Sequence, residues 1–224
     1  MNKKIIYVFA LVAVFISALS CEKEKQPDYT YYYPNAVVTL KTDPEDGKFF
    51  MQLDEKTTLL PVNYEKSPSN EETRAFVRYD KQDGDAGKYT SNVYVHWIKT
   101  IRTKSMAESK GSHDANVAAY ENDPLEILSD FPTVVEDGYF TVGFMTLFGG
   151  VAVHELNLVK GDKPGEVVLY HNAKGDYPAK MDKGVIAFRL DDLDLPQTDG
   201  EIDLVVKWRS FSGDKEHTFK YIPR

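Results

Sequence analysis

Hydrophobic and polar residues alternate along much of this chain, and a period of two predicts β-strands rather than helices. The segment RAFVRYDK (74–81) shows this alternation clearly. Turn residues rich in Gly, Asp and Pro separate it from similar runs on both sides. Within residues 29–104 the pattern predicts five strands, at 36–42, 48–53, 57–62, 74–81 and 91–104. The last of these is long enough to contain a bulge.

The same pattern returns in the second half of the chain. Seven short strands bounded by turn signals argue for a sandwich or a barrel over residues 123–224. They are predicted at 133–136, 139–148, 151–160, 166–171, 185–190, 202–210 and 215–222. Between the two groups, residues 105–122 are small, polar and poorly periodic, which predicts an interdomain linker.

One short helix is predicted where the second group begins, at DPLEIL (123–128). Asp123 can cap it, Pro124 suits the first helical position, and Glu126 has the spacing of a capping box. The expected fold is therefore all-β, with one short helix between two β domains.

The amino-terminal segment has a different character. Lys3 and Lys4 precede an apolar run without charge, and small residues then lead to Cys21. This is the layout of a secretory signal over residues 1–20, and the run is short for a membrane-spanning helix. Such a segment is either a lipoprotein signal, in which the cysteine is lipidated, or a simple secretion signal, in which the cysteine is incidental.

Cys21 is the only cysteine in the chain, and the segment SALSC resembles a lipobox. Lipidation needs a thiolate nucleophile, and several acyl chains give a stable anchor where one gives a marginal one. We therefore expect Cys21 to be the lipidation site and residues 21–28 to be a solvated tether. Cleavage removes two lysines and no acid, which changes the net charge from −8 to −10.

Charge and cysteine content exclude some classes of protein. A net charge of −8 argues against a nucleic-acid partner, which requires a basic face. A single cysteine excludes an internal disulfide framework and a cysteine-rich zinc site. Because the mature chain is acidic, a lipid rather than surface charge would hold it on a membrane.

The histidines offer little catalytic chemistry. His154-Glu155 begins like a zinc-protease helix, but Leu158 occupies the position of the second histidine, and in a strand the pair faces opposite sides. His113 could bind a metal or lie in a solvated loop. His171 could line a site at a strand end or belong to a turn.

No catalytic, cofactor-binding or metal-binding residues are assigned. The chain has no G-x-S-x-G elbow and no glycine-rich phosphate loop. The acidic loops at 80–87 and 191–201 could hold a cation, but hairpin loops explain them better. A two-carboxylate glycosidase stays open, although nothing singles out a pair.

Tyrosines gather just after the tether and form a candidate ligand surface, at Tyr29, Tyr31, Tyr32 and Tyr33. Tyrosine presents a flat amphipathic face suited to sugars or protein partners. The alternative is that these rings cover one end of the first domain. Trp97 and Trp208 are interpreted as core residues.

Several segments in order resemble the NigD-like family of bacterial envelope lipoproteins. They are the lipobox at Cys21, MQLDEKTTLLPVN (51–63), VYVHWIKTI (93–101), NDPLEI (122–127), EDGYFTV (136–142), HNAKGD (171–176) and VKWRSFSGDKEHTFKY (206–221). The resemblance implies an N-terminal OB-like barrel followed by a C-terminal β-sandwich. It carries no catalytic residues over to this chain, and the family name points to a bacteriocin cluster and an immunity role for at least one relative.

The sequence therefore favours a lipid-anchored, non-catalytic binding protein of the cell envelope. Its expected location is the outer membrane, at the periplasmic face or the cell surface, with a glycan or an envelope protein as its partner. A bacteriocin immunity lipoprotein is the alternative, and a small envelope hydrolase is a third hypothesis.

Overall fold

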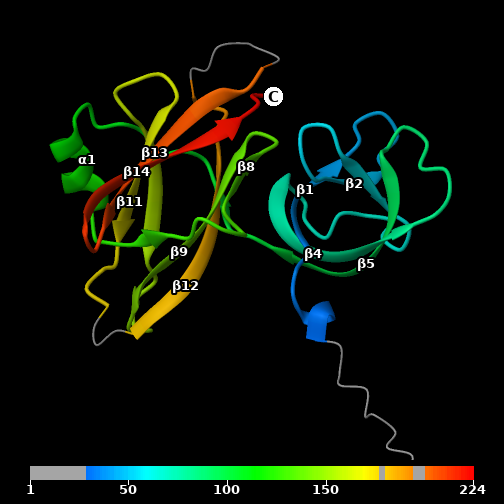
Figure 1. Cartoon of the computed structure of the whole chain (residues 1–224), viewed down its shortest axis with the longest axis horizontal. Coiled ribbons are helices and arrows are strands. Elements are labelled where there is room, and N and C mark those ends of the chain that lie inside the picture. Colours follow the sequence, from blue (N-terminus) through cyan, green and yellow to red (C-terminus); the bar gives the residue numbers. More distant parts are fainter. Residues whose placement is uncertain (1–28, 177–179, 194–199) are drawn as a thin grey trace, which may run out of the picture.

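The computed structural model of the chain describes residues 29–176, 180–193 and 200–224. Two β domains lie side by side, and the amino-terminal one is the smaller (Figure 1). The signal segment, Cys21 and the tether lie outside the described residues, as does most of the acidic segment 191–201. No helix in the described part is both long and apolar enough to cross a membrane.

The first domain is a closed five-stranded barrel that follows a short 3-10 helix, η1 (Tyr29–Tyr32). Its strands are β1 (Ala36–Thr42), β2 (Phe49–Gln52), β3 (Thr58–Pro61), β4 (Thr73–Gln82) and β5 (Ser91–Thr100). The hydrogen-bonded order is β1-β2-β3-β5-β4, and β1 closes the barrel by pairing with β4. Alternate apolar side chains such as Val38, Leu40 and Met51 fill the interior. The five predicted strands and the OB-like barrel are confirmed.

The long strand predicted at 91–104 is divided between the two domains. β5 ends at Thr100, and β6 (Thr103–Lys104) instead pairs in parallel with β12 (Lys180–Arg189) of the second domain. A register shift between Arg78 and Tyr79 in the β4–β5 pairing accounts for the expected irregularity. The chain therefore enters the second domain as part of its sheet.

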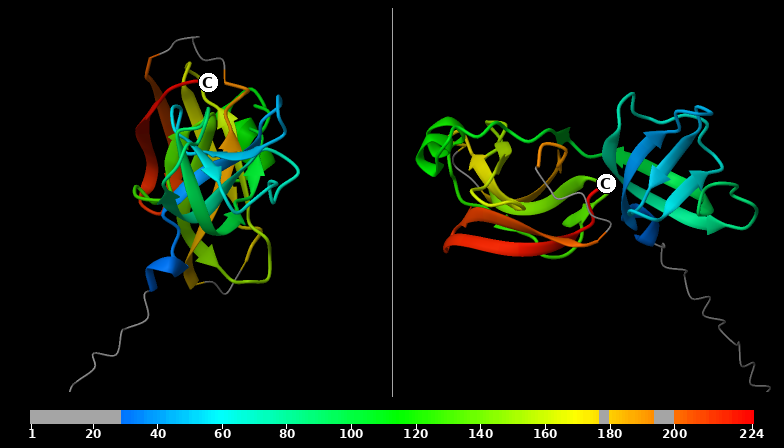
Figure 2. Two further views of the ribbon diagram at one scale, coloured as in Figure 1. Left: turned by 90° about the vertical axis from the view of Figure 1, so that its right-hand side faces the viewer. Right: turned by 90° about the horizontal axis from the view of Figure 1, so that it is seen from above.

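The second domain is a sandwich of two sheets, seen edge-on in the right-hand view of Figure 2. One sheet contains β10 (Glu155–Lys160), β11 (Glu166–Asn172), β13 (Ile202–Ser210) and β14 (Gly213–Tyr221). The other contains β6, β12, β9 (Tyr139–Phe148), β7 (Glu126–Ile127) and β8 (Val134–Glu136). All seven predicted strands are present, and the two-residue strands β6 and β7 are additional.

Two strands of the sandwich begin four or five residues from their predicted starts. β12 begins at Lys180 rather than 185, because its exposed first residues still pair with the end of β9, from Lys180 opposite Phe148 onward. β10 begins at Glu155 rather than 151. The residues before it form a loop whose backbone hydrogen bonds go to the carboxylate of Asp176 instead of a neighbouring strand.

The single short helix is present, but the position predicted for it at 123–128 was wrong. α1 (His113–Tyr120) lies in the segment expected to be a linker, where the side chain of Ser112 caps it by accepting from the backbone N–H of Ala115. Leu125 instead packs in the sandwich core and donates its backbone N–H to Arg209 of β13. Tertiary hydrogen bonds and burial therefore overrode a local capping pattern.

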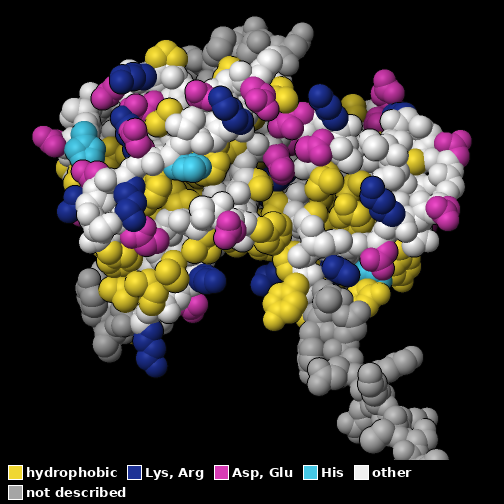
Figure 3. All heavy atoms as spheres, viewed as in Figure 1, with side chains coloured by type: hydrophobic (Ala, Val, Ile, Leu, Met, Phe, Trp, Pro, Cys, Tyr) yellow, Lys and Arg dark blue, Asp and Glu magenta, His cyan; other side chains and the backbone are white. Residues whose placement is uncertain are grey.

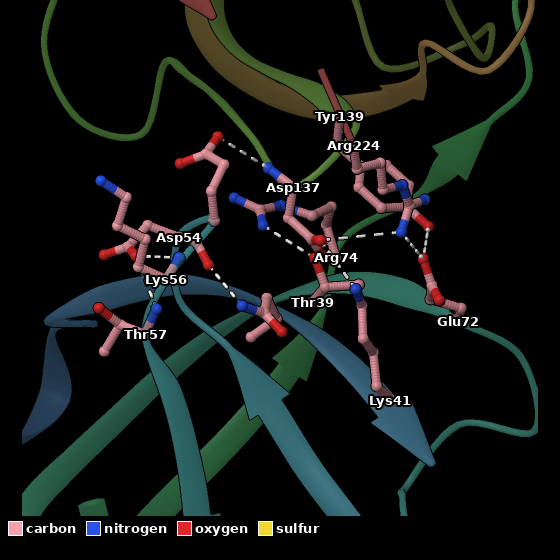
Figure 4. A network of polar contacts seen from close by, with 12 residues as sticks. Thr39, Lys41, Asp54, Lys56, Thr57, Glu72, Arg74, Asp137, Tyr139 and Arg224 are labelled. Carbon is pink, nitrogen blue, oxygen red and sulfur yellow. Dashed lines mark hydrogen bonds and ion pairs between the residues drawn. The ribbon is translucent and has the colours of Figure 1, made fainter. Parts of the chain in front are cut away.

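A polar network joins the two domains (Figure 4). Arg74 of β4 is fully buried, and its guanidinium donates to Thr39 of the barrel and to Thr141 and Glu136 of the sandwich. Each contact lies between 3.0 and 3.2 Å. One arginine therefore satisfies acceptors on both sides of the junction.

A second set of contacts surrounds the ring of Tyr139. Its hydroxyl donates to Glu72 at 2.8 Å, and Arg224 donates to the same carboxylate oxygen at 2.7 Å. Lys41 of the barrel pairs with Asp137 of the sandwich at 2.7 Å. Burial first, and then the Glu72 carboxylate, raise the pKa of Tyr139 to about 12.

An apolar cluster completes the junction. Val37 of β1 and Ile101 lie against Ala187 of β12, all three buried, with Phe76 and Val134 packed around them. Because polar and apolar contacts both cross the junction, the structure holds the barrel in a defined position against the sandwich.

Candidate functional site

A groove on the sandwich domain lies between α1 and the sheet that contains β11, β13 and β14. Its volume is about 570 Å³. Val167 and Leu169 of β11 point into the core, so the alternate residues Glu166, Val168 and Tyr170 face the groove. The groove therefore lies on the outer face of the sheet.

One wall of the groove comes from α1 and the loop before it. His113 Nδ1 lies 3.1 Å from the hydroxyl of Tyr170, and the two rings are 5.9 Å apart. Asn116 is buried and accepts from the backbone N–H of Lys110 through its side chain. These contacts fix the wall against β11. The sequence left His113 open between a metal ligand and a solvated loop residue; it begins a helix and borders the groove.

The opposite wall carries charges that are already paired. Lys207 contacts Glu166 at 2.6 Å, and Arg209 contacts Asp214 at 3.1 Å. Burial alone raises the pKa of Glu166, but the Lys207 ammonium and the backbone N–H of Asp162 outweigh it and hold the pKa below its usual range. Figure 3 shows basic and acidic side chains interspersed over this upper part of the sandwich.

This arrangement is suited to recognition by hydrogen bonds. The groove offers hydroxyl, amide, imidazole and paired ionic groups to a polar ligand. Among the described residues that line it, Glu166 faces the Lys207 ammonium, which keeps this carboxylate ionised. A carboxylate held in its ionised form cannot serve as a general acid near neutral pH.

Two further histidines of the sandwich, His154 and His171, form a buried chain of contacts. His154 Nε2 lies 3.2 Å from Asp176 Oδ2, and His154 Nδ1 lies 2.9 Å from His171 Nε2. His171 Nδ1 reaches the backbone carbonyl of Asp123 at 3.3 Å, and Phe148 stacks on the ring of His154. His171 is therefore part of a buried support behind the 149–154 loop.

The candidate tyrosines lie at the opposite end of the chain, on the barrel. Tyr31, Tyr32 and Tyr33 are exposed, and η1 begins at Tyr29. Trp97 donates its indole N–H to the backbone carbonyl of Tyr31 at 2.7 Å, so it holds η1 in place and is only half-buried. Trp208, by contrast, is buried in the sandwich core as expected.

Sequence reasoning missed most of the groove. Tyr170, Asn116 and the Glu166–Lys207 pair come from segments far apart in the chain, and no local pattern connects them. The one available signal was Ser112 followed by Asp114, a cap and a first-turn acid that mark the start of α1.

A barrel of OB type joined to a β-sandwich defines the class of protein to which the chain belongs. A family model described as the NigD-like N-terminal OB domain matches residues 37–101, and one described as the NigD-like C-terminal beta sandwich domain matches residues 105–221. The chain belongs to the NigD-like family. No curated protein sequence matches it.

Solved structures share the fold over most of the chain. A protein from Parabacteroides distasonis, described as toxin-related, is 29% identical, with a TM-score of 0.68 over 84% of this chain and 92% of that one. A NigD-like immunity protein from Bacteroides caccae is 19% identical, with a TM-score of 0.58 over 84% and 97% of the two chains. A protein of unknown function from Bacteroides vulgatus is 21% identical, with a TM-score of 0.66 over 83% and 89%.

Proposed function

We propose that the chain is a lipid-anchored, non-catalytic binding protein of the cell envelope that captures a polar ligand in the groove beside α1. The observation that carries the proposal is the groove itself, about 570 Å³ in volume and lined by hydrogen-bonding groups that neighbouring side chains hold in place. Because these side chains are already held in position, little free energy is spent on ordering them when a ligand binds. The lipobox at Cys21 supplies the attachment to the membrane.

The binding function is tested by a photo-crosslinking amino acid on β14. Lys215 borders the groove, whereas Lys220 lies further along the same strand and does not. Lys215 and Lys220 are both exposed and both in surface ion pairs, so they form a matched pair. We expect discrete crosslinked products in intact cells from position 215 alone, whether the partner is a glycan or an envelope protein. Equal products from both positions, or none from either, would contradict the groove assignment.

The anchor is tested separately by Cys21→Ala. We expect the wild-type protein to fractionate with the outer membrane and the variant to be released in soluble form. Protease treatment of intact cells then distinguishes the cell surface from the periplasmic face. A variant that stays membrane-bound as firmly as the wild type would overturn the lipid anchor.

Self-protection against a toxin is the second candidate function. It is supported by the NigD-like immunity protein that shares the fold and by the toxin-related description of the relative at 29% identity. Deletion of the gene would then make cells sensitive to a toxin encoded nearby, and restoring the protein would remove that sensitivity. Unchanged sensitivity to every neighbouring toxin would exclude this function.

A further inference from the structure

The distance between the proposed lipid anchor and the folded protein is limited by the chain itself. Eight residue steps separate Cys21 from Tyr29, the first residue of η1. An extended chain advances about 3.5 Å per residue, so η1 lies within roughly 28 Å of the lipidated residue. The end of the molecule that carries η1 therefore lies near the membrane whenever the anchor is in place.

Exposed tyrosines surround this attachment point. Tyr32 and Tyr33 are 75% and 69% exposed, and Tyr94 of β5 is exposed nearby on the barrel. The ring of His96 connects Tyr31 to Tyr94. Its centroid lies 4.8 Å from that of Tyr31 and 5.3 Å from that of Tyr94. Tyrosine is enriched at membrane–water interfaces, where the ring is apolar and the hydroxyl stays in contact with water.

The sandwich carries a second exposed apolar group, at the loop between β9 and β10. Val151 and Val153 are 77% and 75% exposed, and Met181 at the start of β12 is 47% exposed. The pairing of Phe148 with Lys180 places the loop and the beginning of β12 at the same end of the sheet. We call Val151, Val153 and Met181 the sandwich tip.

The loop of the sandwich tip is held rigidly by a single carboxylate. Asp176 accepts the backbone N–H groups of Gly149, Gly150, Val151 and Ala152, at 2.6, 2.9, 2.8 and 3.1 Å. Burial raises the pKa of Asp176, but these four donors outweigh it and hold the pKa far below its usual range. The valines are therefore fixed in an exposed position and do not fold back onto the core.

The two apolar groups lie at the same end of the molecule. In Figure 1 the beginning of β12 and η1 both lie at the lower edge, one on each domain, and the left-hand view of Figure 2 shows the same after a quarter turn. Figure 3 shows hydrophobic side chains along this lower edge of both domains, with Lys and Arg and some Asp or Glu side chains among them. The junction described above keeps the two ends in a common orientation.

Cationic side chains beside the sandwich tip complement anionic headgroups. A second pocket, of about 310 Å³, opens next to the tip. Its described lining residues include Arg102, Lys104, Lys183 and His154, together with apolar side chains and no acidic residue. In a chain with a net charge of −8 this is a local excess of positive charge.

We propose that the tyrosines around η1 and the sandwich tip together form a face that rests on the phospholipid bilayer in which Cys21 is anchored. This inference rests on the lipid anchor of the proposed function and adds an orientation to it. With this face on the membrane, the groove beside α1 lies toward the other end of the sandwich, because Gly161 and Asp162 of its lining follow β10 at the end opposite the sandwich tip.

The unique cysteine makes the test direct, because an acylated Cys21 leaves an introduced cysteine as the one free thiol. The full-length lipoprotein carrying Val153→Cys, Tyr33→Cys or Lys163→Cys is labelled with an environment-sensitive fluorophore. It is then reconstituted into vesicles of phosphatidylethanolamine and phosphatidylglycerol. Lys163 is exposed in the turn after β10, at the far end of that strand from the tip, and serves as the control.

Spin-labelled lipids are expected to quench the labels at 153 and 33 several-fold more than the label at 163. Equal quenching at all three positions, in protein that floats with the vesicles, would overturn the membrane-resting face and leave the anchor intact. Protein that does not float would overturn the anchor and this inference together. Val151→Asp with Met181→Asp, two other changes in the sandwich tip, is then expected to abolish quenching of the label at 153 while flotation persists, and unchanged quenching would also contradict the proposal.

Discussion

At the residue scale, His171 couples the stability of the sandwich to pH. Burial and then the neighbouring imidazole of His154 hold the pKa of His171 below its ordinary value of 6.5. The folded protein therefore binds this proton less well than the unfolded chain does. The stabilisation is complete above pH 6.5 and is lost as the pH falls below 6.5 toward the folded pKa.

We therefore expect the urea midpoint of the wild-type protein to fall between about pH 7 and about pH 5. His171→Gln removes this titration, so its midpoint should change less over the same interval. His217→Gln, at an exposed position on β14, is the control and should follow the wild type. A His171→Gln curve parallel to that of the wild type would show that His171 does not contribute.

At the element scale, the pairing of β9 with β12 depends on a glycine. Gly184 lies opposite Phe144, and an added Cβ would meet the aromatic ring at 2.3 Å. The ring of Phe144 is buried in the sandwich core and has little room to move. The absence of a side chain at Gly184 therefore leaves room for the ring of Phe144.

Gly184→Ala should destabilise the protein by about 1–3 kcal/mol, the usual range for overpacking a core. Thermal or urea unfolding measures the change, and Lys183→Ala at the exposed neighbouring position should stay within about 0.5 kcal/mol of the wild type. A Gly184→Ala variant as stable as this control would show that the ring can move aside.

At the scale of the whole molecule, Arg74 connects the unfolding of one domain to that of the other. Burial lowers the pKa of Arg74 and raises that of Glu136, and in each case it outweighs their mutual attraction. The pair is thus costly to bury, and its value lies in positioning the barrel on the sandwich. Removing either Arg74 or Glu136 leaves the other charge buried at the junction without an opposite charge beside it.

Arg74→Met should cost roughly 3–5 kcal/mol and separate a single unfolding transition into two, one for each domain. Adding Glu136→Gln should recover part of the loss, since no unpaired charge is then left at the junction. Calorimetry with separate probes of the two domains measures both effects. A wild-type protein that already unfolds in two independent steps would contradict the coupling.

The sequence by itself determined the strands of both domains, because alternation of apolar and polar residues follows from burying one face of a sheet. Segments 36–42 and 202–210 were predicted at their observed bounds. The resemblance to NigD-like proteins added the barrel and the sandwich. Such patterns are local, and a predicted strand forms in the folded protein where the fold buries its apolar residues.

Tertiary structure decided what depends on residues far apart in the chain. Leu125 left its predicted helix because the sandwich core and the carbonyl of Arg209 stabilise an extended backbone there. Arg74 became a junction residue only because Thr141 and Glu136 lie across from it. The groove beside α1, and the face formed by the tyrosines around η1 and the sandwich tip, likewise bring together segments that share no local pattern. Their positions follow from packing and hydrogen bonding between distant strands, which no single stretch of sequence encodes.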